Sequence, residues 1–140
     1  MTSENSKISL VKDTIDKKDV NELVKWLKTN PRLTKGELTT QFENNWSTWL
    51  GSKYSVFVNS GSSANLVMVA ALKKHLKWKD GDEVIVSPVG FPTTIAPIVQ
   101  NGLKPVFIDI EFDTLNFDVN LIEQAIKRGV NSNRLLFANR

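Results

Sequence analysis

The sequence Tyr54-Ser55-Val56-Phe57-Val58-Asn59-Ser60-Gly61-Ser62-Ser63-Ala64-Asn65 decides the fold, because an apolar run leads through a turn of small residues into a helical pattern. The apolar run over residues 54–58 predicts a buried strand, and the small residues predict a helix that begins near Ser62. The first N–H groups of a helix have no partners within it, and the helix dipole leaves partial positive charge there. The turn is therefore a candidate site for a phosphate.

Three residues of this turn, Gly61, Ser62 and Ser63, are the candidates for contact with an anion. Gly61 has no Cβ that would block a close approach, and both serines carry hydroxyl donors. Ser and Gly before a helix are also ordinary caps and turn formers, so this plainer interpretation stays open. No Gly-Lys-Ser/Thr follows, and the further glycines of a dinucleotide fingerprint are missing, which excludes a P-loop and argues against a Rossmann-type nucleotide binder.

The composition is that of a globular protein, with 140 residues of which 41% are hydrophobic and 24% charged. The longest apolar run, residues 66–72, is far shorter than the roughly 20 residues that a membrane span needs. The polar amino terminus lacks the apolar centre of a secretory signal. Cysteine is absent, so disulfides and thiolate metal sites are excluded, which fits a cytoplasmic location. We expect no membrane partner and no metal.

A basic run, Lys73-Lys74-His75-Leu76-Lys77-Trp78-Lys79, resembles a nucleic-acid-binding patch. It falls at the end of the helix predicted after the turn, where cations complement the helix dipole. The net charge of the chain is a modest +3. We therefore expect no nucleic-acid partner and interpret these lysines as solvated charge.

Two helices are predicted ahead of the turn. The first has apolar residues at helical spacing behind a capping pattern at Asp19, and it ends before Pro31. The second follows the loop Thr34-Lys35-Gly36 and ends at Gly51, which suits a left-handed C-cap. Its tryptophans, Trp46 and Trp49, are interpreted as core residues rather than a ligand platform.

Beyond the turn, strand patterns alternate with helical patterns. Strands are predicted at residues 54–58, 83–86, 105–110 and 134–137, and helices at 62–77, 93–100 and 119–127. Helix-length crossovers indicate a parallel sheet, and nearly all-apolar strands indicate that helices cover both of its faces. The predicted fold class is α/β with a three-layer, mostly parallel sheet. The chain ends just after an apolar strand that nothing covers, so we expect it to be the front portion of a longer protein.

Several motifs in order along the chain resemble the DegT/DnrJ/StrS family of fold-type-I pyridoxal-phosphate enzymes, which act on nucleotide-linked keto sugars. They are Asn59–Leu66, Gly81–Val86, Gly90–Thr94 and Gln100–Ile110. The last two are most similar to the CDP-4-keto-6-deoxyglucose 3-dehydrase branch. The resemblance implies an N-terminal arm and amphipathic helix in residues 1–37, and in residues 38–140 a partial large domain of the fold-type-I transferase fold, truncated at its C-terminus.

The resemblance also implies a cofactor, pyridoxal 5'-phosphate or pyridoxamine 5'-phosphate. Gly61, Ser62 and Ser63 match the family's turn that binds the cofactor phosphate, and Phe91 falls where the family places an aromatic ring against the pyridine ring. Phe91 follows a predicted strand at its carboxyl end, the edge at which ligands collect in open α/β sheets. The plainer alternative is that Phe91 is a loop residue folded into the core.

No catalytic residue is expected within the chain, because the family's lysine or histidine and its ring-nitrogen aspartate would lie beyond Arg140. Asp109 is interpreted as a residue that shapes a turn. The full-length form is expected to be a homodimer that acts on a nucleotide-linked 4-keto-6-deoxy sugar for O-antigen-type polysaccharide, with the chain itself inactive. Amino transfer and 3-deoxygenation both stay open, as does an iron–sulfur centre in the missing part. A non-catalytic interaction module or a remnant of such an enzyme is the alternative.

Overall fold

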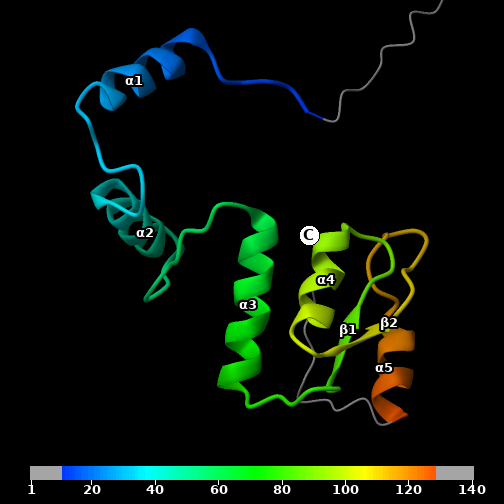
Figure 1. Ribbon diagram of the computed structural model, residues 1–140. Coiled ribbons are helices and arrows are strands. Elements are labelled where there is room, and N and C mark those ends of the chain that lie inside the picture. The colour runs from blue at the N-terminus through cyan, green and yellow to red at the C-terminus, as the bar shows by residue number, and fades with distance from the viewer. Residues whose placement is uncertain (1–10, 129–140) are drawn as a thin grey trace, which may run out of the picture. The chain divides into compact units, whose positions relative to one another are not determined.

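The computed structural model describes residues 11–128, and the chain divides into two compact units between Ser55 and Val56. We call residues 11–55 the helical unit and residues 56–128 the sheet unit (Figure 1). The boundary predicted after residue 37 concerns domains of the full-length family and stays a prediction. No helix within residues 11–128 is both long and apolar enough to cross a membrane.

The helical unit contains α1, Lys17–Leu27, and α2, Glu37–Leu50, as the periodicity predicts. The N-cap of α1 is Asp16, which accepts hydrogen bonds from the amides of Lys18 and Asp19. The Asp19 carboxylate bonds back to the Asp16 amide and completes a capping box. The expectation that Asp19 begins the helix is therefore wrong by one turn, because the earlier aspartate takes the orphan amides. Gly51 ends α2 in the left-handed conformation at φ 75°, as expected.

The apolar side chains of the helical unit are exposed. Trp46 and Trp49 contact each other with ring centroids 4.9 Å apart, yet they are 46% and 74% exposed. The interpretation of these tryptophans as core residues is therefore wrong for the structure described. Helical spacing gathers apolar side chains on one side of a helix, but it does not supply the surface that would cover them.

The elements of the sheet unit follow one another in the order αβαβα. Its elements are α3, Gly61–His75; β1, Glu83–Val86; α4, Pro92–Gln100; β2, Lys104–Phe107; and α5, Val119–Lys127. The two strands pair in parallel, with Glu83 opposite Lys104 and Val86 opposite Phe107. The α/β class and the parallel sheet are confirmed. The strand predicted at residues 134–137 lies outside the described residues.

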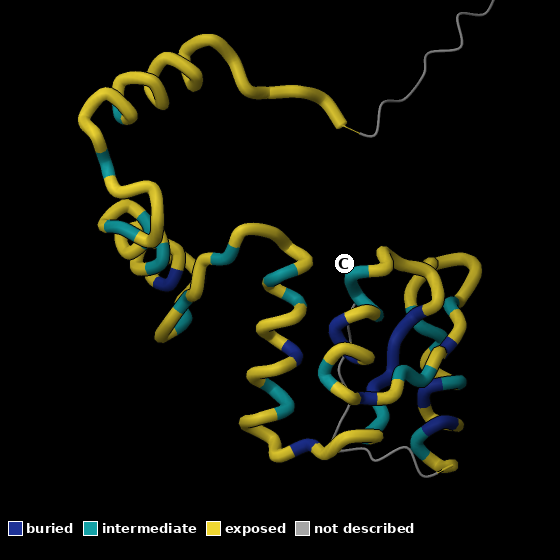
Figure 2. Tube along the Cα trace, in the orientation of Figure 1, coloured by how far each residue is buried: buried dark blue, intermediate teal, exposed yellow. Residues whose placement is uncertain are grey.

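Most of β1 is buried (Figure 2). Its side chains point alternately to the two faces of the sheet and belong to two cores. Val84 and Val86 pack with residues of α3 and α4, and Ile85 packs with residues of α5. The sheet thus lies between one helical layer formed by α3 and α4 and another formed by α5, as a three-layer fold requires. The first core contains Val69, Trp78, Val84, Val86, Ile98 and Leu103, and the second contains Ile85, Ile108, Ile122 and Ala125.

The strand predicted at residues 54–58 is not formed. Residues 54–58 have no strand assignment, and within residues 11–128 the sheet consists of β1 and β2 alone. Val56 and Phe57 are 71% and 56% exposed. A strand requires a neighbouring strand to bond its N–H and C=O groups, and an apolar sequence by itself does not provide that neighbour.

The helices α3 and α4 run parallel to each other. Near their starts, the Asn65 side chain donates Nδ2–H to the Thr93 carbonyl at 3.2 Å. Near their ends, the Lys73 ammonium donates to the Asn101 carbonyl. Because α4 follows the carboxyl end of β1, both helices begin at that edge of the sheet and end at the opposite, amino edge.

The amino edge is held by a tight set of contacts around Asp80. Lys73 forms an ion pair with Asp80, and the Gly81 amide donates to the Gly102 carbonyl at 2.7 Å. Gly102 has φ 70°, and a Cβ built on it would lie 2.8 Å from Asp80 Oδ1. The left-handed conformation favours glycine at residue 102, and an added Cβ would displace the Asp80 carboxylate from its place beside Lys73.

Candidate functional site

The predicted anion-binding turn is the N-terminus of α3. Ser60 is the N-cap, and its hydroxyl oxygen accepts the Ser63 amide at 3.2 Å. The first intrahelical bond runs from the Ala64 amide to the Ser60 carbonyl at 3.0 Å. Within residues 11–128 the amides of Gly61 and Ser62 have no hydrogen-bond partner, and both residues are exposed. These two N–H groups are therefore open to an anion.

Ser63 differs from its two neighbours because its polar groups already have partners. Its amide bonds to Ser60, and its hydroxyl donates to Asn59 Oδ1 at 2.7 Å. Ser63 is half-buried, whereas Ser62 is exposed. An anion at this turn would thus meet the amides of Gly61 and Ser62 and the Ser62 hydroxyl directly, and it would meet Ser63 only if the Ser63 hydroxyl rotated away from Asn59.

A Cβ built on Gly61 would have no heavy atom within 4 Å, and its φ is not in the left-handed region. Neither the backbone conformation nor a close neighbour within the described chain therefore requires glycine at this position.

Phe91 lies at the same edge of the sheet as this turn. It is the N-cap residue of α4, 72% exposed, and its carbonyl accepts the Thr94 amide at 2.9 Å. Pro92 follows as the first helical residue, where its missing N–H costs nothing. The alternative of a loop residue folded into the core is wrong, because the Phe91 ring is open to solvent.

The sequence did not predict the hydrogen-bonding roles of two asparagines in this region. Asn59 receives the Ser63 hydroxyl, and Asn65 links α3 to α4. The signal for Asn65 lies in Pro97, which sits inside α4 and has no N–H to offer the Thr93 carbonyl. A proline inside a predicted helix indicates an acceptor four residues earlier that needs a partner from elsewhere.

Asp109 and the lysines behave largely as structural groups. The Asp109 carboxylate accepts the Ile110 amide at 2.8 Å and its carbonyl accepts the Asp118 amide at 3.1 Å, which confirms its role in a turn.

Lys73 is the exception to the interpretation of the lysines as solvated charge, since its side chain is 23% exposed and paired with Asp80. The hydrogen bond and the positive charge of Lys73 lower the pKa of Asp80.

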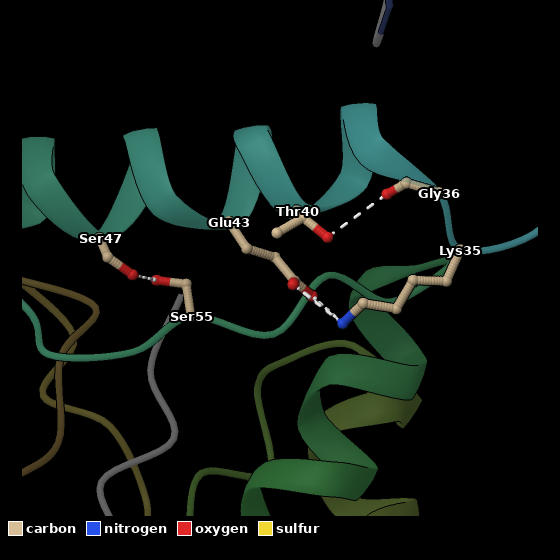
Figure 3. A network of polar contacts seen from close by, with 6 residues as sticks. All are labelled: Lys35, Gly36, Thr40, Glu43, Ser47 and Ser55. Atoms are coloured by element: carbon tan, nitrogen blue, oxygen red, sulfur yellow. Dashed lines mark hydrogen bonds and ion pairs between the residues drawn. The ribbon is translucent and has the colours of Figure 1, made fainter.

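The loop Thr34-Lys35-Gly36 belongs to the helical unit and is tied to α2 (Figure 3). The Lys35 ammonium bonds both carboxylate oxygens of Glu43, at 3.0 and 2.9 Å, and the Gly36 carbonyl accepts the Thr40 amide at 3.2 Å. A hollow of about 660 Å³ lies beside this loop and is lined by Trp26, Arg32, Thr34 and neighbouring residues. Its lining includes none of the residues predicted to contact the cofactor.

The carboxyl edge of the sheet has groups that could bind an anion and a ring. It presents free amides, a hydroxyl and an aromatic ring, which match a phosphate carried on a flat ring. Within residues 11–128, no group of three or more histidine, cysteine, aspartate or glutamate side chains could hold a metal ion.

Comparison with known proteins gives concordant results. GDP-4-keto-6-deoxy-D-mannose 3-dehydratase of Yersinia pseudotuberculosis is 44% identical over 119 residues, which are 84% of this chain and 30% of the relative. The lipopolysaccharide biosynthesis protein RfbH of Salmonella typhimurium is 43% identical over 98 residues, 67% of this chain and 22% of the relative. The chain thus spans less than a third of the length of these relatives.

Solved structures agree with the sequence relatives. A crystal structure of GDP-4-keto-6-deoxymannose-3-dehydratase with a trapped PLP-glutamate geminal diamine superposes with a TM-score of 0.73 at 38% identity, covering 90% of this chain and 32% of that one. The pattern of the DegT/DnrJ/EryC1/StrS aminotransferase family matches residues 13–131. The chain therefore belongs to the DegT/DnrJ/EryC1/StrS aminotransferase family.

Proposed function

We propose that this chain supplies the phosphate- and ring-binding part of a nucleotide-sugar 3-dehydrase or aminotransferase that uses pyridoxal 5'-phosphate or pyridoxamine 5'-phosphate. One observation carries the proposal: two amides at the start of α3 that have no partner among residues 11–128 lie at the same sheet edge as the exposed ring of Phe91. When bound, the cofactor supplies an electron sink for the sugar chemistry.

The residues proposed to hold the cofactor are Gly61, Ser62, Ser63 and Phe91. The amides of Gly61 and Ser62 bind the phosphate, and the helix dipole adds to that attraction. Neither the backbone conformation nor a close neighbour requires glycine at position 61. A phosphate that approaches the backbone there would explain it, because glycine has no Cβ in the way. Phe91 packs against the pyridine ring and fixes its plane.

The substrate proposed for the full-length protein is a nucleotide-linked 4-keto-6-deoxy sugar, in polysaccharide biosynthesis of the O-antigen type. The 3-dehydratase names of the 44%-identical relative and of the superposed crystal structure favour 3-deoxygenation over amino transfer. The lipopolysaccharide protein RfbH supports the polysaccharide context. We further propose a cytoplasmic location and a homodimer for the full-length form.

The chain itself is proposed to bind cofactor weakly and without a covalent bond, and to be inactive. Within the sheet unit, Lys73 and Lys104 lie at the amino edge, where they pair with Asp80 and Glu83, rather than at the α3 turn. Transamination or dehydration of a nucleotide sugar by the purified chain would refute the proposed inactivity. A borohydride-trapped adduct on one specific lysine would refute non-covalent binding.

A titration of the 140-residue chain with each cofactor, followed by visible absorption, tests the binding role. Since the two cofactors share the phosphate, we expect similar affinities for both. Ser62→Asp should weaken binding at least tenfold, because it places a negative charge beside the phosphate while suiting the start of a helix. Asn45→Asp, the same charge change on exposed α2, should leave binding unchanged. Equal affinity of Ser62→Asp and the unchanged chain would contradict the proposal.

A non-catalytic interaction module is the second candidate, favoured by the exposed apolar side chains of the helical unit. Leu38, Trp46 and Trp49 are 55%, 46% and 74% exposed. Exposed apolar patches of this kind often mark protein interaction surfaces. Failure to bind either cofactor, with a stable fold retained, would favour this module over the enzyme part.

A further inference from the structure

Pro97 creates a local problem inside α4. It lies at the sixth position of the helix Pro92–Gln100 and is buried. Because proline has no N–H, the carbonyl four residues earlier, that of Thr93, loses its helical partner. Thr93 is half-buried, so its unpaired carbonyl would carry a desolvation cost.

The partner of this carbonyl comes from the neighbouring helix. Asn65, in the second turn of α3, donates Nδ2–H to the Thr93 oxygen at 3.2 Å across 28 residues of sequence. The amide of Asn65 thus fills the place that Pro97 leaves empty. The two residues act as a pair, since the proline frees the acceptor and the asparagine uses it.

This bond lies at the functional end of both helices. Asn65 is only three residues beyond Ser62, and Thr93 is only two residues beyond Phe91. At the other end, Lys73 holds the Asn101 carbonyl and Asp80. With both ends fastened, the first turn of α4 cannot slide along α3 without breaking a hydrogen bond.

We propose that Asn65 is a positioning residue, which holds the first turn of α4 beside the first turn of α3 so that Phe91 and the Gly61-Ser62 amides face one ligand. This inference rests on the proposed function for its ligand. It assigns Asn65 no contact with the cofactor. Its effect passes through the Thr93 carbonyl and the backbone that leads to Phe91.

A purely structural role would be to satisfy the Thr93 carbonyl and nothing more. The two roles are separable, because Pro97→Ala restores an N–H within α4 that reaches the same carbonyl. In that variant the carbonyl has a partner without Asn65, whereas Asn65 supplies the hydrogen bond that is described within residues 11–128 between the two helices at this end. The double variant Asn65→Ala/Pro97→Ala therefore keeps the carbonyl satisfied and removes the link.

The experiment compares four versions of the 140-residue chain: unchanged, Asn65→Ala, Pro97→Ala, and the double variant. Denaturation midpoints report stability, and titration with pyridoxal 5'-phosphate reports affinity. We expect Asn65→Ala to lower both the denaturation midpoint and the affinity. The affinity should fall about fivefold, which corresponds to the net free energy of one ordinary hydrogen bond. The double variant should recover the midpoint of Pro97→Ala but stay about fivefold weaker than Pro97→Ala in affinity. Recovery of both properties, or unchanged affinity in Asn65→Ala, would overturn the proposal.

A measurement without ligand separates this proposal from the proposed function. Relative to Pro97→Ala, the double variant should show shifted backbone amide signals of Phe91, Thr93 and Thr94 in an ¹⁵N–¹H spectrum, while the signals of α5 should not shift. Unshifted signals would overturn the positioning role whatever the ligand does. Shifted signals with no cofactor binding by the unchanged chain would overturn the proposed function and the ligand assigned to Asn65, and would support the link between the helices.

Discussion

The sheet unit and the helical unit use apolar residues in opposite ways. All the buried apolar residues of the described chain, from Val69 to Ala125, belong to the sheet unit, whereas Ser47 is the one buried residue of residues 11–55. The helical unit is held instead by caps and polar contacts, such as the capping box of Asp16 and the Lys35–Glu43 ion pair. Both units have regular helices, so helix formation and core formation are separate properties of this sequence.

This difference teaches what hydrophobic periodicity can specify. In the sheet unit, the apolar side chains of β1 meet complementary ones on α3, α4 and α5, and burial stabilises the arrangement. In the helical unit, Leu23, Trp46 and Trp49 show similar spacing and stay exposed. The residues proposed to bind the cofactor lie on the unit with the core, as precise positioning would require.

The largest expected difference between the units comes from deleting the same side chain in each. Ile85→Ala empties a site that is 0% exposed between β1 and α5, and should lower the free energy of unfolding by about 3 kcal/mol. Ile15→Ala removes a side chain that is 72% exposed and should change it by less than about 0.5 kcal/mol. Urea denaturation followed by circular dichroism measures both. Equal effects would break the contrast.

A smaller effect is expected from adding a methyl group to a left-handed glycine in each unit. Gly102→Ala combines φ 70° with a contact of 2.8 Å to Asp80 Oδ1, and should cost about 2 kcal/mol or more. Gly51→Ala has φ 75° and no neighbour within 4 Å, so it should cost about 1 kcal/mol, visible as helicity lost from α2. If the two substitutions lower the free energy of unfolding by the same amount in denaturation experiments, the contact between residue 102 and Asp80 has no effect on stability.

Removal of one N-cap from each unit sharpens the comparison further. Ser60→Ala frees the Ser63 amide at the start of α3 and should lower the stability of the sheet unit by about 1 kcal/mol. Asp16→Ala should unwind the first turn of α1 and leave the stability of the sheet unit unchanged. Hydrogen exchange of individual amides distinguishes the two results. Loss of protection in α3 from the Asp16 variant would show that the units fold together.

The smallest expected effect is a response of the sheet unit to acid. Lys73 lowers the folded-state pKa of Asp80 below its ordinary value of 3.8. The ion pair therefore stabilises the fold above that ordinary pKa, and its contribution is lost as the pH falls through the lower, folded-state pKa. Asp80→Asn should reduce the acid dependence of the unfolding free energy in this range. An identical pH profile for both proteins would show that the pair contributes nothing.

Most of the fold could be predicted where one segment of sequence carries its own signal. The bounds of α5 at Val119 and Lys127 follow from its periodicity, and the left-handed end of α2 follows from Gly51. The strand expected at residues 54–58 could not be judged in this way, because pairing depends on a neighbour that the segment does not encode. The exposure of Trp46 and Trp49 was unpredictable for the same reason.

The candidate site follows a similar rule. The turn at Gly61 and Ser62 could be located from small residues ahead of a helix, and the structure places it at the start of α3. The engagement of the Ser63 hydroxyl by Asn59 depends on side-chain geometry that composition does not reveal. The contact between Asn65 and Thr93 joins segments 28 residues apart, and only the proline at residue 97 hints at it.

The most direct test of the account is an ¹⁵N–¹H titration of the whole chain with pyridoxal 5'-phosphate. The account predicts the largest shifts at the amides of Gly61, Ser62 and Phe91, with none in α1 or α2. No shift at Gly61 and Ser62, or shifts confined to the hollow beside Thr34, would contradict it.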